Sequence, residues 1–452
     1  MKQQNDVFVV GQRSMRMATV CGMLLAGLVL MPAKGTQSAE PTGIREINTI
    51  EGPGDCYVGS NTFGNVLAVS GGKTLSSERG FVGHSKESTG NRVEISGRGS
   101  SWSCGDATII GYRGGDNHLV IRQGGSLLSG WPVGGKKTST SQWEHGWVGF
   151  WSEGNDVLVT DPGSVWSNKF LCIGEWGRDN SLVVSNGATV FSRQGWIGGD
   201  PNANGNQVTV TGPGSVWENQ GDMSVGRYGL DCMLDIRDGG TVAAGNLAVG
   251  EFYQTMGQTV AIKSSKVRVD GGTLVVTNAA GNAVLSLGES PSQVILNDGT
   301  VTVDKIVVNP GMLAVYPQFG PNLLVFKGGS LCSKGTTVNN GRLFTVGDGQ
   351  HTAGFQLLGG THSFANGLCV SSNAVLSGHG VIAGNVKIEG SLAFGKGTSE
   401  VGGAVTNNGC IELQNGANVT FQNPVFNNGK IVSTKGVMNF KGGVTGPGSV
   451  TR

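Results

Sequence analysis

The sequence is poor in charge, proline and aromatic residues. Charged side chains make up 14% of its 452 residues and the formal net charge is +1, whereas an ordinary globular domain carries charge on about a quarter of its residues. No long run of lysine and arginine occurs, so the chain lacks the clustered cations that a nucleic-acid surface needs to offset phosphates. We therefore expect no nucleic-acid partner. The glycines follow no every-third-residue period, which excludes a collagen-like chain.

Long apolar runs are missing except for one near the start, at residues 18–30. Basic residues precede this run and small residues, among them Ala33 and Ala39, follow it. At roughly 13 residues it is too short to span a bilayer, but it fits the apolar region of a secretory signal peptide. We predict that residues 1–39 are a signal peptide cleaved after Ala33 or Ala39, and that the exported chain has no transmembrane segment after cleavage.

Cysteine is also scarce. Cys21 falls inside the predicted signal peptide, and the other seven cysteines form no CxxC pair and no Cys/His cluster at zinc spacing. An odd number at wide spacing argues against a disulfide framework, so we expect most of them to be small buried hydrophobes. These seven are Cys56, Cys104, Cys172, Cys232, Cys332, Cys369 and Cys410.

Glycine, by contrast, is abundant, and a repeat organises the chain. The 79 glycines separate short alternating runs of Val, Leu and Ile, which are typical of β structure. A Val or Ile before Gly, and a strand after a Gly-containing turn, recur with one period and one interruption. The most regular landmark is an asparagine that opens a strand, with steps of 26, 26, 38, 25 and 26 residues, at Asn65, Asn91, Asn117, Asn155, Asn180 and Asn206.

A repeat of about 25 residues with two or three short strands cannot bury its apolar side alone. Stacking the units solves this, because each strand pairs in parallel with its equivalent one coil away. The sequence therefore predicts an all-β fold, a single-stranded right-handed parallel β-helix (solenoid) of about 25-residue coils. A leucine-rich repeat has a similar period, but its LxxLxLxxN signature is absent. We predict regular coils over 40–252 with an insertion at 131–147, and less regular, partly shorter coils over 253–452.

Two recurring residue types are expected to serve the stack rather than a ligand. The stretch GPGSVW (212–217) and its relatives place tryptophan in every second coil, at Trp102, Trp166 and Trp217, which predicts a bulky packing residue after a turn. The recurring asparagines are predicted to form a hydrogen-bonded ladder of side-chain amides. Three glutamates that follow the Gly of an IG, VG or LG pair are expected to be solvated turn residues and not a stacked acidic site, namely Glu175, Glu251 and Glu289.

The step of 38 residues marks the candidate binding segment. It adds about 12 residues within 131–151, a stretch that holds four of the nine tryptophans. Insertions in repeat proteins form loops on one face, often the binding face, and aromatic rings there stack on sugars or anchor a protein partner. The alternative is that Trp147 and Trp151 simply pack onto the coils. The candidate contact residues are Trp131, Lys136, Lys137, Trp143, Trp147 and Trp151.

The sequence contains no complete catalytic motif that we can identify. Polygalacturonase-like hydrolases resemble the chain at one tripeptide, GHG at 378–380, but they need a set of aspartates that is absent here, and we interpret the GHG as a chance tripeptide in a Gly-rich turn. The six histidines form no HExxH, and neither a GxSxG elbow nor a phosphate loop occurs. We predict no catalytic residue, no metal and no cofactor. The alternative is a β-helix polysaccharide lyase or glycoside hydrolase whose acid residues the sequence does not reveal.

The repeat pattern N-x-[VL]-x-[VI]-x-G-x-GS-x-W with intervening VG resembles the autotransporter passenger-like, Gly-rich repeat proteins exported by Gram-negative bacteria. The segment SGHGVIAGNVKIEGSLAFG (377–395) is similar to the GxGxIxGNVxxxGxLxPG block near the end of their repeat regions. We expect no C-terminal translocating barrel within this sequence, because such a barrel needs many strands of about ten residues and too few residues follow Gly395.

This resemblance implies a parallel β-helix and an exported structural or adhesive protein that is extracellular, at the cell surface or associated with the outer membrane. Side loops of such a rod would contact surface glycans or proteins. A separate outer-membrane transporter is an expected partner.

Overall fold

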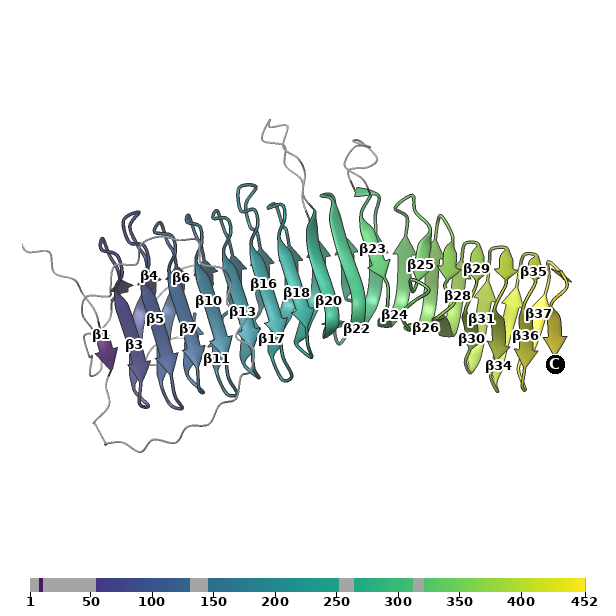
Figure 1. Ribbon diagram of the computed structural model, residues 1–452, viewed down its shortest axis with the longest axis horizontal. Coiled ribbons are helices and arrows are strands. Elements are labelled where there is room, and N and C mark those ends of the chain that lie inside the picture. The colour runs from purple at the N-terminus through teal and green to yellow at the C-terminus, as the bar shows by residue number, and fades with distance from the viewer. Residues whose placement is uncertain (1–7, 11–53, 131–144, 252–263, 312–320, 452) are drawn as a thin grey trace, which may run out of the picture.

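The computed structural model describes residues 8–10, 54–130, 145–251, 264–311 and 321–451. Within these ranges the chain forms one 39-stranded sheet in which the paired strands run parallel, and no α-helix is present. The sheet winds into a rod whose coils stack along the long axis (Figure 1). The predicted all-β parallel β-helix is thereby confirmed. No helix among the described residues is long and apolar enough to cross a membrane.

Each coil has three faces. On the first face, strands pair with their equivalents in the coils before and after, as β10 does with β7 and β13. Strands confined to this face are β1 (Phe8–Val10), β3 (Val66–Ser70), β5 (Arg92–Ser96), β7 (His118–Arg122), β10 (Asp156–Thr160), β13 (Ser181–Ser185), β16 (Gln207–Thr211), β18 (Met233–Arg237), β23 (Leu323–Phe326), β25 (Phe344–Val346), β27 (Leu368–Val370), β29 (Val386–Ile388), β32 (Val405–Asn407), β35 (Val425–Asn427) and β38 (Val444–Thr445).

The second and third faces follow in the same order in every coil. Strands confined to the second face are β8 (Ser126–Ser129), β11 (Val165–Ser167), β14 (Thr189–Ser192), β30 (Ser391–Phe394), β33 (Cys410–Leu413), β36 (Lys430–Ser433) and β39 (Ser449–Thr451). Strands confined to the third face are β2 (Cys56–Val58), β9 (His145–Val148), β12 (Phe170–Ile173), β15 (Gln194–Ile197), β21 (Val284–Leu287), β31 (Gly397–Val401), β34 (Ala417–Phe421) and β37 (Val437–Phe440).

Longer strands bend across a corner without a break. Strand β20 (Ser265–Val276) joins the first and second faces, and β22 (Ser292–Val308) runs over all three. Strands that join the second and third faces are β4 (Thr74–Val82), β6 (Ser101–Ile110), β17 (Val216–Val225), β19 (Thr241–Val249), β24 (Gly329–Val338), β26 (Ala353–Phe364) and β28 (Ala374–Ala383).

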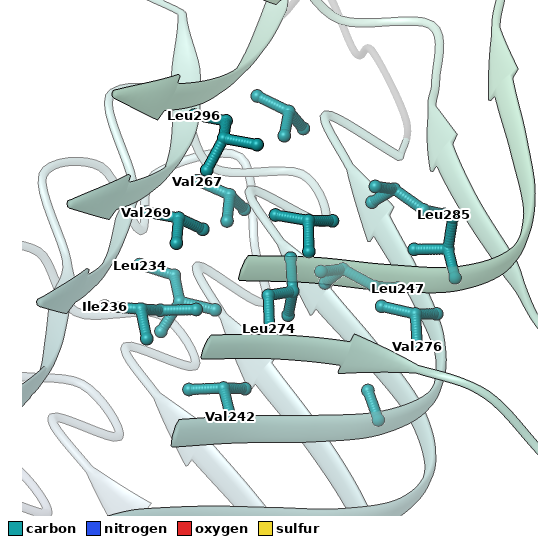
Figure 2. Packing of buried hydrophobic residues seen from close by; sticks show 14 of the residues in the cluster. Leu234, Ile236, Val242, Leu247, Val267, Val269, Leu274, Val276, Leu285 and Leu296 are labelled. Carbon is teal, nitrogen blue, oxygen red and sulfur yellow. The ribbon is translucent and has the colours of Figure 1, made fainter. Parts of the chain in front are cut away.

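Alternating side chains fill the interior of the rod. In β10, for example, Val157 and Val159 are buried and their neighbours are not. Figure 2 shows Leu, Val and Ile from several coils pointing into one continuous core. Each such side chain contributes roughly 1.5–3 kcal/mol on burial. The coils shorten towards the C-terminal end, as predicted: Val386 and Val405, which pair, are 19 residues apart, and Val405 and Val425 are 20 apart.

The tryptophans of the repeated corner lie inside the rod. In register along the second face, Trp102, Leu127, Trp166, Val190 and Trp217 follow one another, so a tryptophan occupies every second coil as predicted. All three indoles are fully buried. Each leans against a glycine on the third face of the preceding coil, in the pairs Trp102 with Gly80, Trp166 with Gly146 and Trp217 with Gly195.

The asparagine ladder also forms as predicted. In every step the side-chain Nδ2 of one asparagine donates to Oδ1 of the next, at 2.7, 2.8, 3.1, 2.9 and 3.1 Å from Asn65 through Asn206. The step of 38 residues between Asn117 and Asn155 does not interrupt it. The insertion therefore leaves the coils on either side in register.

Several predictions fall partly outside the described ranges. Strand β1 lies within the predicted signal peptide, and the rest of residues 1–39 is outside the described residues. Of the predicted insertion at 131–147, residues 145–147 belong to β9 and the rest is outside the described residues.

The seven described cysteines are free, but only Cys104, Cys172 and Cys232 are buried, so the expectation that most would be buried is wrong. The others have partly exposed side chains because they occupy outward positions or the first coil.

Candidate binding site

Aromatic side chains gather on the outer surface of the third face, over coils between residues 57 and 196. Because side chains alternate along a strand, the residue before each inward Val or Ile points outward. In register along β2, β4, β6, β9, β12 and β15, this outward position holds Tyr57, Phe81, Ile109, Trp147, Cys172 and Trp196. In the next coils it holds Ser224 and Ala248. We call this aromatic surface, together with the corner beside it, the aromatic face.

The corner after the third face adds a second row of rings. Gly149 has a φ of 73°, and a Cβ atom there would clash with the Asn180 amide of the ladder. Glycine at this position allows the turn that is followed by the buried Phe150 and the exposed Trp151. The same turn in the next coil presents Glu175 and Trp176, and the backbone N–H of Trp176 donates to the backbone carbonyl of Phe150 at 2.9 Å.

Buried rings support exposed ones on the aromatic face. Phe150 packs against Trp147 with ring centroids 5.2 Å apart and against Tyr112 at 5.4 Å. Trp147 and Phe150 are buried, whereas Trp151 is 47% exposed and Trp176 is 45% exposed. Phe150 therefore supports Trp151, with ring centroids 5.1 Å apart, and Trp176 is exposed one coil further on.

A hollow of about 520 Å³ opens between these rings. This volume lies in the range of small-molecule sites, roughly 300–1,000 Å³. The hollow combines apolar rings with three polar side chains from different coils. Its described lining consists of Tyr112, His145, Trp147, Phe150, Trp151, Phe170, Glu175, Trp176, Gln194 and Trp196.

Glu175 is the acidic residue of this hollow, and it is not the solvated turn residue that the sequence predicts. Its Oε2 atom is buried and receives no hydrogen bond from an N–H or O–H group of the described residues. Burial raises the pKa of the Glu175 carboxyl, and the charge of Asp200 adds to this, while the Cys172 thiol and the Arg227 guanidinium act in the opposite direction. Packing from the neighbouring coils, invisible in the local sequence, causes the difference. Glu251 is partly buried and lies 3.7 Å from the Arg227 guanidinium, and Glu289 is exposed as expected.

A guanidinium group lies at each end of the hollow. Arg227 stacks on Trp196, with its Cζ atom 3.6 Å from the ring centroid. At the other end, Arg113 lies 5.3 Å from the Trp151 centroid and 5.8 Å from that of Tyr112. Such cation–π contacts are typically worth about 0.5–1 kcal/mol at exposed sites.

The structure brings two of the predicted contact residues together, Trp147 and Trp151. The buried Trp147 packs onto the coil, as the alternative interpretation expects, and the exposed Trp151 borders the hollow. Trp131, Lys136, Lys137 and Trp143 lie outside the described residues, so their role as contacts remains a prediction. The insertion leads directly into β9, which supplies His145 and Trp147 to the hollow.

Sequence reasoning missed the other rings of the hollow, among them Phe170, Trp176 and Trp196. A signal was available, because the residue just before the Val-Gly or Ile-Gly pair is aromatic at Tyr57, Phe81, Trp147 and Trp196. Among the residues that the structure describes, no group of three or more His, Cys, Asp or Glu side chains is placed to hold a metal ion.

No protein-family model matches the chain, and no curated protein matches it. Among solved structures, the chain is similar to the crystal structure of a TibA fragment that was hyper-glycosylated in a reaction catalysed by TibC. The two share 14% sequence identity, and the match covers 88% of this chain and 94% of the fragment with a TM-score of 0.32. We draw no functional conclusion from a similarity at this level.

Proposed function

We propose that the chain is an exported, non-enzymatic surface rod that binds glycans or proteins through its aromatic face. The observation that carries this proposal is the pair of exposed indoles, Trp151 and Trp176, beside a hollow with a buried aromatic base. Large exposed aromatic clusters on soluble proteins typically mark interaction sites. The predicted signal peptide and the resemblance to autotransporter passengers support export.

The β-helix suits an adhesive role because it holds ligand-contacting side chains on a stiff support. Parallel pairing fixes successive coils about 4.8 Å apart, so rings such as Trp151 and Trp176 keep their spacing without a bound ligand. Preorganised groups lose little entropy on binding, which favours affinity.

Fractionation of the native cell tests the localisation. We expect the chain in the medium or the outer-membrane fraction, and we expect a variant that lacks residues 1–39 to stay in the cytoplasm. Accumulation of the intact chain in the cytoplasm would contradict the proposal. Loss of surface exposure after deletion of a separate outer-membrane transporter would identify that partner.

Adhesion of cells that display the chain tests the binding surface. The double variant Trp151→Ala/Trp176→Ala is expected to reduce adhesion at least tenfold, about 1.4 kcal/mol of binding free energy, because both exposed rings are lost. Phe426→Ala is the matched control, since this side chain is 47% exposed but lies on β35, far along the rod. Equal adhesion by both variants would rule out the aromatic face.

A glycan-cleaving enzyme is the second candidate, and Glu175 is the observation that favours it. A half-buried carboxyl with a raised pKa is what a general acid requires. Glycosidases use a second carboxyl about 5–9.5 Å away, and among the described residues that line the hollow Glu175 is the single acidic one. The GHG at 378–380 lies inside strand β28 and not, as expected, in a turn.

Incubation with polysaccharides separates the two candidates. The adhesive proposal expects no new reducing ends and no unsaturated products. Cleavage by the wild-type chain that disappears in Glu175→Gln, with binding retained, would establish the enzyme instead.

A further inference from the structure

We propose that the hollow of the aromatic face binds a neutral hexopyranose unit, stacked on Trp151 and Trp176 and hydrogen-bonded by Glu175, Gln194 and His145. The inference rests on the proposed function, since it names the ligand class of the same site.

The rings offer flat apolar surfaces of the right kind for a sugar. A pyranose ring has faces of C–H groups, which carry slight positive charge and are attracted by the negative face of an aromatic ring. Trp151 and Trp176 occupy equivalent positions in adjacent coils, and Phe150 supports Trp151 with ring centroids 5.1 Å apart. A hollow of about 520 Å³ holds one or two sugar rings against these indoles.

The polar side chains match the hydroxyl groups of such a ring. A carboxylate only accepts hydrogen bonds, an amide both donates and accepts, and a neutral imidazole does both as well. Glu175, Gln194 and His145 therefore provide complementary partners within one hollow. The buried Oε2 of Glu175 lacks an O–H or N–H donor from the described residues, and a sugar hydroxyl would supply it. An apolar peptide side chain would leave that atom without an N–H or O–H donor, which is costly.

The charges at the ends of the hollow argue for a neutral ligand. Arg227 lies over Trp196 and Arg113 lies near the Trp151 ring, so two positive charges stand at the ends of the hollow where a quaternary ammonium ligand would bind. The same guanidinium groups repel a cation. The acidic side chain of Glu175 lies among the polar groups of the hollow and disfavours a second carboxylate beside it, so a neutral ring meets the fewest unfavourable charges.

Calorimetric titration of the purified full chain tests the inference with three probe classes: neutral methyl hexopyranosides, the acidic sugar galacturonate, and choline. We expect at least one neutral glycoside to bind, with affinity reduced at least tenfold in Trp176→Ala and about three- to tenfold in Glu175→Leu. Phe426→Ala should bind like the wild type. An unchanged unfolding midpoint shows that each variant is folded.

The outcomes also separate this inference from the proposed function. Binding of choline or galacturonate in place of every neutral glycoside overturns the inference and leaves the aromatic face as a binding site. Absence of saccharide binding together with adhesion that still depends on Trp151 and Trp176 overturns the inference alone and indicates a protein ligand. Absence of saccharide binding with adhesion that ignores both tryptophans overturns both proposals.

Discussion

Replacement of Trp217 with alanine is expected to lower the free energy of unfolding by about 3–5 kcal/mol, the usual cost of truncating a buried tryptophan. The indole is fully buried, and its Nε1–H donates to Ser192 Oγ at 3.0 Å. Truncation opens a cavity inside the rod and leaves that hydroxyl without its donor. Urea unfolding followed by far-ultraviolet circular dichroism measures the loss as a shift of the midpoint.

The glycine beneath the indole provides the matched test of the same contact. A Cβ atom on Gly195 would lie 2.8 Å from Trp217 Cζ2, so Gly195→Ala should destabilise the chain by about 1–3 kcal/mol through overpacking. Gly354→Ala is the control, because that Cβ would meet no atom within 4 Å in β26. Trp217→Leu should remove most of the destabilisation caused by Gly195→Ala, leaving the contact of the new Cβ with Asn219 Oδ1 at 3.2 Å, and a double-mutant cycle detects this coupling. Equal losses of stability in the two glycine variants would show that the Trp217 indole does not need the space that the missing Cβ of Gly195 provides.

Replacement of Asn180 with alanine is expected to cost about 2–4 kcal/mol, because it interrupts the asparagine ladder. Oδ1 of Asn180 accepts both the backbone N–H of Asn155 at 3.0 Å and its side-chain Nδ2 at 2.9 Å. Removal leaves two buried donors without an acceptor, at about 1–3 kcal/mol each before relaxation. The same urea titration measures this cost, and faster hydrogen exchange at the Asn155 amide would locate it.

Asn428→Ala is the control for the ladder. Asn428 also donates to an asparagine one coil away, Asn408 at 2.9 Å, but this pair is exposed. Because water replaces the lost bond there, the change should stay within about 0.5 kcal/mol. A similar cost for Asn180→Ala and Asn428→Ala would contradict the view that burial makes the ladder essential.

The repeat made much of the fold predictable. Asn91 and Asn117 occur at a fixed step because the same corner is built in every coil, and Trp166 and Trp217 alternate with Leu127 and Val190 because two indoles in adjacent coils would crowd one core position. A residue that repeats at the coil period thus reports its place in the cross-section.

The candidate site was less predictable because it depends on contacts between coils. Glu175 follows a glycine and resembles a solvated turn residue, but the next coil approaches it at Gly199, and the charge of Arg227, from a later coil, lowers its pKa against the effect of burial. Trp196 resembles any apolar strand residue until the register places it two coils from Trp147. Likewise, no local sequence pattern predicts that β22 continues unbroken over three faces. Such features arise from packing between residues that are distant in sequence.

The most direct test of the central claim, that the aromatic face is the ligand-binding surface, is a glycan array probed with the purified wild-type chain and with Trp151→Ala/Trp176→Ala. We expect the wild-type chain to bind a subset of glycans rich in neutral hexoses, and we expect the double variant, with an unchanged unfolding midpoint, to lose at least nine-tenths of that signal. Retention of the full signal by the double variant would show that ligands bind elsewhere on the chain.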